Sequence, residues 1–105
     1  MTSENWIQVM TQRIVDQFSP KRIILFGSQA RGDAGPHSDV DLLIVLAEVK
    51  DRRQETIRIR QALADLPVAK DVFITTPEEI RLRGDLVGSV LRPALREGKV
   101  LYEQT

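Results

Sequence analysis

Two aspartates separated by a single residue follow a glycine–serine pair in the first half of the chain. Ten residues lie between Gly27-Ser28 and the acidic pair Asp39 and Asp41. A glycine lets backbone amides approach a phosphate without steric conflict, and the serine hydroxyl adds a donor. Carboxylate oxygens are the hard ligands that Mg²⁺ prefers. The spacing therefore predicts a site that binds a nucleotide together with its metal ion.

The two acidic side chains are expected to point the same way. Residues i and i+2 of a strand project from one face, about 6.5 to 7 Å apart. Two carboxylates beside a buried strand repel each other and lose hydration, and a divalent cation relieves both effects. Asp71 opens the next predicted strand, and if the two strands are neighbours it supplies a third carboxylate. Sequence alone leaves that adjacency open.

These residue types divide naturally among the roles of phosphoryl-type chemistry, in which metal ions neutralise phosphate oxygens and a base takes the proton of the attacking hydroxyl. Asp71 is the candidate base. Gly27 and Ser28 are expected to hold the β- and γ-phosphates through backbone amides and the hydroxyl. Arg31 is expected to donate a charge-assisted bond to a phosphate oxygen. Asp39 and Asp41 then remain as metal ligands.

Each feature taken singly has a simpler structural interpretation. A second glycine–serine pair, Gly88-Ser89, has no acidic pair after it and is interpreted as structural. Arg31 alone is more often a surface residue, and His37, the single histidine, lacks a second imidazole for a zinc site. Arginines such as Arg52 alternate with acids and are interpreted as a solvated helix face. The conjunction of the motif residues is what favours a functional site.

The pattern of apolar residues and breakers predicts alternating helices and strands. Apolar residues at steps of three and four, such as Met10 and Ile14, mark helices, and short β-branched runs mark strands. Ser3 and Thr76 are the predicted N-caps of the helices 3–18 and 77–83. Gly27-Ser28 is predicted as a tight turn, followed by a loop that contains His37. The fold class is therefore α/β or α+β, with a mixed central sheet flanked by helices. The predicted helices are 3–18, a segment between 51 and 66, 77–83 and 85–97, and the predicted strands are 22–26, 40–46, 71–75 and 99–102.

Composition limits the remaining possibilities. A chain of 105 residues is expected to form a single domain over 1–105. Fifteen acidic and fifteen basic residues balance, so a DNA-coating protein is not expected. The absence of cysteine fits a reducing compartment, and the cytoplasm is the default expectation. No segment resembles a signal peptide or a membrane span, and the last strand offers an edge through which a homo-oligomer or hetero-oligomer can form.

The motif Gly27-Ser28, ten residues, Asp39-Val40-Asp41 resembles the signature of the polymerase-beta-like nucleotidyltransferase superfamily. The segments 29–32 and 76–79, together with Ser38 and Asp71, are similar to the minimal nucleotidyltransferases, a family of short stand-alone domains. The resemblance implies a nucleotidyltransferase fold, Mg²⁺ held by Asp39, Asp41 and Asp71, and ATP as substrate. It also places Ser38 among the nucleotide-binding residues, beside Gly27, Ser28 and Arg31.

Minimal nucleotidyltransferases are often paired with a HEPN-domain protein, so the resemblance implies that partner and an antitoxin role in a type VII-like toxin–antitoxin pair. The implied reaction is transfer of AMP from ATP to a tyrosine hydroxyl of the toxin. Three alternatives stay open: neutralisation of the toxin by binding alone, transfer to a small molecule such as an aminoglycoside, and transfer to an RNA 3′ end. Larger relatives carry an extra helical domain for the acceptor, which this chain lacks, so a partner protein is expected to complete the site.

Overall fold

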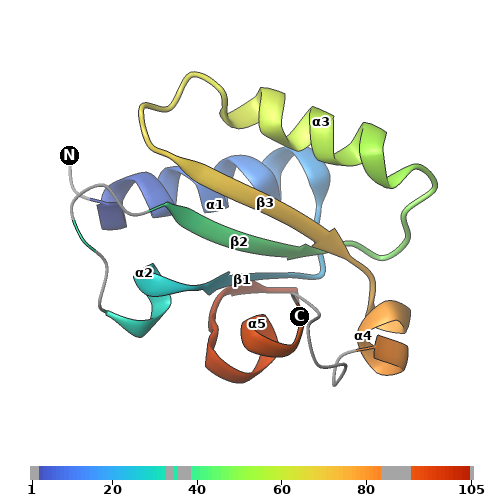
Figure 1. Cartoon of the computed structure of the whole chain (residues 1–105). Coiled ribbons are helices and arrows are strands. Elements are labelled where there is room, and N and C mark those ends of the chain that lie inside the picture. Colours follow the sequence, from blue (N-terminus) through green and yellow to red (C-terminus); the bar gives the residue numbers. More distant parts are fainter. Residues whose placement is uncertain (1–2, 33–34, 36–38, 84–90, 105) are drawn as a thin grey trace.

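A computed structural model of the chain describes residues 3–32, 35, 39–83 and 91–104. Helices and strands alternate along it much as the sequence predicts (Figure 1). Its elements are α1 (Ser3–Phe18), β1 (Arg22–Phe26), α2 (Ser28–Arg31), β2 (Val40–Val45), α3 (Arg52–Leu63), β3 (Lys70–Thr75), α4 (Pro77–Arg83), α5 (Leu91–Glu97) and β4 (Lys99–Glu103).

The four strands form one mixed sheet in the order β3-β2-β1-β4. β1 runs antiparallel to both β2 and β4, whereas β2 and β3 are parallel and are joined through α3. β3 and β4 are therefore the two edges. The predicted fold class, a mixed central sheet flanked by helices, is confirmed.

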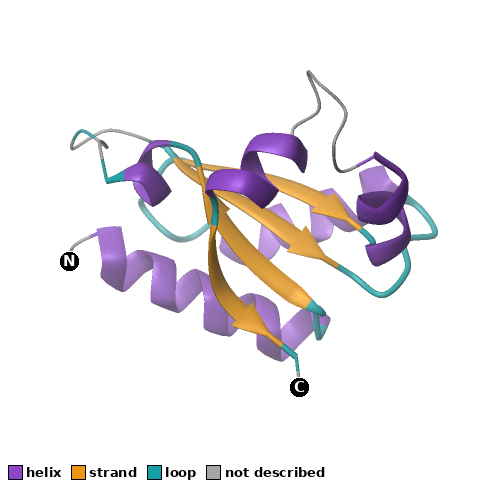
Figure 2. Ribbon diagram, turned by 90° about the horizontal axis from the view of Figure 1, so that it is seen from below, coloured by secondary structure: helices purple, strands orange, loops and turns teal. Residues whose placement is uncertain are grey.

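The two faces of the sheet are covered by different helices. α1 and α3 cover one face, and α2, α4 and α5 lie on the other side (Figures 1 and 2). The larger core cluster fills the α1/α3 side and includes Met10, Ile14 and Leu42, all fully buried. A smaller cluster on the α5 side contains Phe26 and Leu43. Alternate residues of each strand therefore serve different cores, because successive side chains point to opposite faces.

Local sequence signals account for several helix starts. The Asp51 side chain caps α3 by accepting a hydrogen bond from the amide of Gln54, and the hydroxyl of Thr76 accepts one from the amide of Glu79 at the start of α4. Both are N-cap contacts of the kind that short polar side chains favour. The predicted threonine cap of the fourth helix is confirmed, whereas Ser3 is the first residue of α1 in place of its predicted cap.

The structure departs from the sequence prediction most clearly after Gly27. The segment predicted as a turn and loop contains a short helix, α2, which ends at Gly32 in the left-handed conformation with φ 82°. One turn of helix is too short to produce a periodic apolar pattern, which explains why the pattern did not indicate it. α3 ends at Leu63, a few residues before the predicted boundary near Leu66.

Arg52 is exposed, as its interpretation as part of a solvated helix face predicts, and it also makes contacts that the sequence did not indicate. Its guanidinium donates hydrogen bonds to the backbone carbonyl of Ile74 and to the carboxylate of Glu79. The same carboxylate accepts a hydrogen bond from the buried hydroxyl of Thr75. Arg52 thus joins the start of α3 to the end of β3 and the start of α4, a proximity that no sequence pattern indicated.

Several predictions concern residues outside the described part of the chain. These are the nucleotide-binding role of Ser38, the loop position of His37, the structural interpretation of Gly88-Ser89 and the first half of the predicted helix 85–97. Among the described helices, none combines the length and the apolar character needed to cross a membrane.

Candidate nucleotide and metal site

Gly27 sits directly after β1 in a backbone conformation that only glycine adopts readily, with φ 74° and ψ −158°. A Cβ built on it would lie 2.2 Å from the Oδ2 atom of Asp41. The close approach follows from the pairing of β1 with β2, because Phe26 lies opposite Asp41 in the antiparallel register. The lack of a side chain at Gly27 therefore lets the turn and the carboxylate approach each other closely.

The parallel pairing of β2 and β3 brings two predicted site residues side by side. Asp41 is in register with Asp71, so the two Cα atoms lie on neighbouring strands about 4.8 Å apart. Asp39 precedes β2 by one residue, and its charge acts on Asp41. The adjacency that the sequence left open is thus decided by strand order.

Burial is the largest influence on the carboxyl group of Asp41, and it raises the pKa of that group above its ordinary value. The negative charges of Asp71 and Asp39 raise it further, and the nearby guanidinium of Arg31 acts in the opposite direction. Asp41 is half-buried, Asp71 likewise, and Asp39 is exposed. The arrangement concentrates negative charge on one partly desolvated group.

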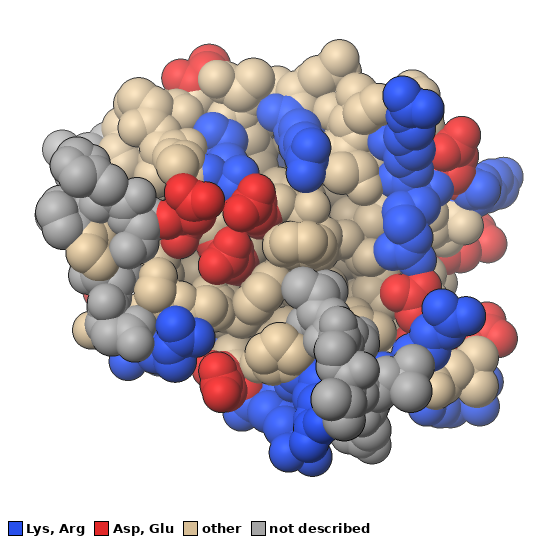
Figure 3. Space-filling model, in the orientation of Figure 1, with Lys and Arg blue, Asp and Glu red and all other residues tan. Residues whose placement is uncertain are grey.

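Figure 3 shows acidic side chains gathered over the starts of β2 and β3, with basic side chains around them. Three carboxylates that disfavour one another are the oxygen donor set that Mg²⁺ takes, so the residues fit this ion by chemistry and charge. Within the described ranges, no three His, Cys, Asp or Glu side chains already form a closed ligand set. The fit therefore rests on donor type and charge.

Arg31 lies at the last residue of α2 and connects the site to α5. Its guanidinium forms an ion pair with the carboxylate of Glu97, with 3.7 Å between Nη1 and Oε2, and its charge also reaches Asp41. About half of each paired side chain is exposed, so the ion pair contributes little stability. It does hold a cation beside the acidic cluster, where the sequence predicted a phosphate contact.

Two residues near this site escaped the sequence analysis. No sequence pattern indicated Glu97, because its ion pair with Arg31 depends on how α5 packs. Phe73 had a signal that was not used: it follows Asp71 by two residues, the same spacing as in Asp39-Val40-Asp41. In a strand that spacing puts its ring on the face of the carboxylates.

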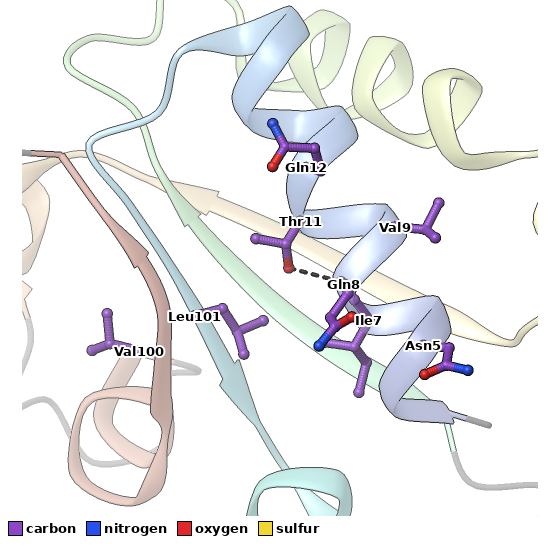
Figure 4. Close-up of a pocket in the computed structure, with 8 residues that line it drawn as sticks. All are labelled: Asn5, Ile7, Gln8, Val9, Thr11, Gln12, Val100 and Leu101. Carbon is purple, nitrogen blue, oxygen red and sulfur yellow. Dashed lines mark hydrogen bonds between the residues drawn. The ribbon is translucent and has the colours of Figure 1, made fainter.

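A groove lies elsewhere, between α1 and the edge strand β4 (Figure 4). This open groove measures about 760 Å³ and is lined by Asn5, Ile7, Gln8, Val9, Thr11, Gln12, Val100 and Leu101. None of these side chains is charged, and none belongs to the acidic cluster. The groove therefore offers no charged group to a phosphate or a metal ion, in contrast to the starts of β2 and β3.

A sequence model of the nucleotidyltransferase domain matches residues 9–98, most of the chain. The chain belongs to the nucleotidyltransferase domain family. The match includes Gly27, Asp39, Asp41 and Asp71, and thus the whole acidic cluster together with the turn beside it. A search of the curated proteins gave no match.

Solved structures share the fold of this nucleotidyltransferase domain. A proposed nucleotidyltransferase from Sulfolobus solfataricus superposes with a TM-score of 0.68 at 16% identity, over 95% of this chain and 79% of that one. A toxin–antitoxin complex with AMP-PNP gives 0.56 at 23% identity, over 98% and 75%. A complex of tri-AMPylated Shewanella oneidensis HEPN toxin with MNT antitoxin gives 0.55 at 19% identity, over 99% and 74%. The expected similarity to minimal nucleotidyltransferase antitoxins is thus confirmed at the level of the fold.

Proposed function

We propose that the chain is a Mg²⁺-dependent nucleotidyltransferase that transfers AMP from ATP to a tyrosine hydroxyl of a partner HEPN toxin and so acts as its antitoxin. One observation carries the proposal. The charges of Asp71 and Asp39 act on Asp41, and the three residues lie beside the Gly27 turn. The family match supports nucleotidyl transfer, and the structures of related fold with AMP-PNP and with an AMPylated toxin support the nucleotide and the acceptor.

Different residues bind the phosphates and the metal ion in the proposed reaction. The Gly27 turn and the Ser28 hydroxyl bind the β- and γ-phosphates, and Arg31 donates to a phosphate oxygen. Asp39, Asp41 and Asp71 hold Mg²⁺, which when bound neutralises charge on the reacting and leaving phosphate oxygens. Ser38 completes the proposed nucleotide contacts.

Asp71 acts as the base of the proposed step. Its carboxylate accepts the proton of the acceptor hydroxyl as the hydroxyl oxygen forms a bond to the α-phosphorus of ATP. The bond from that phosphorus to the bridging oxygen breaks, and pyrophosphate leaves with the electron pair. The products are the AMP ester of the acceptor, pyrophosphate and the proton on Asp71.

Intact-mass measurement of the partner tests the proposal. The purified chain is incubated with ATP, Mg²⁺ and the protein encoded beside it, and the partner is expected to gain the mass of one or more AMP groups. Asp41→Asn is expected to abolish the gain. Asp16→Asn makes the same chemical change on the exposed face of α1 and is the matched control, expected to react like the wild type.

Two outcomes would overturn the catalytic proposal. One is a partner whose mass stays unchanged although it is neutralised, since that favours neutralisation by binding. The other is an Asp41→Asn variant that transfers AMP at the wild-type rate. Transfer to an aminoglycoside or an RNA 3′ end in place of the partner would keep the enzyme class and change the acceptor.

A further inference from the structure

The face of the sheet that carries the acidic residues also carries an aromatic side chain. Asp71 and Phe73 are two residues apart in β3 and so project from the same face, about 6.5 to 7 Å apart. The register pairs Asp71 with Asp41 and Phe73 with Leu43. Phe73 packs against the smaller cluster, which contains Leu43 and Phe26. Its ring therefore lies on the side of the carboxylates.

A second ring fixes the position of Phe73. The centroids of Phe26 and Phe73 are 5.7 Å apart, and the ring planes are inclined by 52°. This is within the range of favourable tilted aromatic pairs. Phe26 is buried, with 6% of its surface exposed, whereas Phe73 is only half-buried. The pair thus holds the ring of Phe73 in place, and the residue keeps part of its surface accessible.

This aromatic pair is distinctive in a chain with few aromatic residues. All five aromatic residues lie within the described ranges, and the other three, Trp6, Phe18 and Tyr102, pack against the larger cluster on the α1/α3 side. Phe26 and Phe73 are therefore the aromatic side chains on the face of the carboxylates. A partly exposed phenylalanine at that place can pack against an apolar planar ligand.

The acidic cluster has β1 on one side and the edge strand β3 on the other. Gly27 follows β1, Asp41 lies in β2 and Asp71 lies in β3, which is an edge strand. Because the proposed phosphate contacts lie on the β1 side, the β3 side is left for the acceptor. Phe73 is on that side, next to the proposed base.

We infer that Phe73 is a specificity-determining residue for the acceptor, and that its ring contacts the ring of a tyrosine whose hydroxyl meets Asp71. The inference rests on the proposed function, since it assigns the acceptor of the same site. Asp71 and Phe73 are neighbours on one face of β3, about 6.5 to 7 Å apart along the strand, so a tyrosine whose hydroxyl meets Asp71 can bring its ring to that of Phe73. A serine hydroxyl at Asp71 would leave the ring of Phe73 without a contact.

The kinetic test compares two acceptors and two variants. The acceptors are the partner toxin with its modified tyrosine and the same toxin with serine in that place. Phe73→Leu keeps an apolar side chain and removes the ring. It is expected to lower kcat/KM for the tyrosine acceptor about 2- to 12-fold, which is the rate effect of losing one aromatic pair. Phe18→Leu makes the same change on the opposite side of the sheet and is expected to keep the wild-type ratio of tyrosine to serine transfer.

A binding measurement separates this inference from the proposed function. N-acetyl-tyrosinamide is titrated into the full chain without nucleotide, and the ring signals of Phe73 and Phe26 are followed by NMR. They are expected to shift, whereas N-acetyl-serinamide is expected to leave them unchanged. Shifts at Phe73 without any AMP transfer by the wild type would refute the proposed function and support the aromatic subsite. An unchanged tyrosine-to-serine ratio in Phe73→Leu, or the absence of shifts, would overturn the inference.

Discussion

Replacing Gly27 with alanine tests whether the position of the Asp41 carboxylate requires a residue without a side chain at the turn. The backbone of Gly27, at φ 74° and ψ −158°, lies in a region that costs other residues about 1 to 3 kcal/mol. The added Cβ would also sit 2.2 Å from Oδ2 of Asp41 and 3.2 Å from its Cγ. The carboxylate must then rotate away, at about 0.5 to 1.5 kcal/mol for a displaced rotamer.

Together these contributions predict that Gly27→Ala lowers the free energy of unfolding by about 1.5 to 4.5 kcal/mol. For a domain of this size the melting temperature falls by about 10 to 20 °C. AMP transfer is expected to be lost even below the melting temperature, because the moved carboxylate of Asp41 no longer occupies its place. Urea unfolding and the transfer assay measure the two effects separately.

A double-mutant cycle isolates the contact from the backbone strain. In an Asp41→Ala background the carboxylate is gone, and the nearest atom that remains, Cβ of residue 41, lies at an ordinary 3.6 Å. Gly27→Ala should then cost only the backbone part, which leaves a coupling of about 0.5 to 1.5 kcal/mol between the two sites. Strictly additive effects would refute the reasoning, as would a Gly27→Ala variant as stable and active as the wild type.

Gly32→Ala is the matched control. Gly32 also has a positive φ, 82°, but an added Cβ would meet nothing within 4 Å. The substitution is expected to cost about 1 to 2 kcal/mol of stability through the left-handed backbone alone and to leave AMP transfer intact. Loss of transfer in this variant would mean that any strain near α2, and not the contact with Asp41, disables the site.

Three further predictions concern charge and packing. Gly98→Ala should destabilise the fold by about 3 kcal/mol in urea unfolding, because its Cβ would lie 2.4 Å from Cγ2 of the buried Ile24; a change below 0.5 kcal/mol would contradict this. Asp41→Asn should stabilise the metal-free protein by about 1 kcal/mol, because it removes a partly desolvated charge and its repulsion with Asp71 and Asp39. Mg²⁺ is expected to raise the melting temperature of the wild type but not that of this variant; a variant that melts below the wild type in EDTA would contradict the first part. The hydrogen bond from Arg13 lowers the pKa of Asp65, so Asp65→Asn should be less stable than the wild type at pH 7, and the difference should shrink as the pH falls below the ordinary value of 3.8; a difference that persists at pH 2 would exclude this cause.

Much of the fold follows from local patterns. The stripe of Met10 and Ile14 predicted α1, the run from Val40 predicted β2, and Thr76 predicted the start of α4, each within a few residues of the observed bounds. These signals are readable because burial repeats with the period of the helix or strand, and because a cap bonds within its own first turn. The short helix α2 has no such period, and it was missed.

The residue types and spacing at Gly27, Ser28, Asp39 and Asp41 were enough to predict phosphate and metal chemistry, because each choice has a local physical reason. Tertiary structure alone decided what surrounds them. Strand order put Asp71 in register with Asp41, the packing of α5 brought Glu97 to Arg31, and the face of β3 set Phe73 beside the proposed base. Such contacts join residues distant in sequence, and their energies depend on which elements become neighbours, which no local pattern encodes.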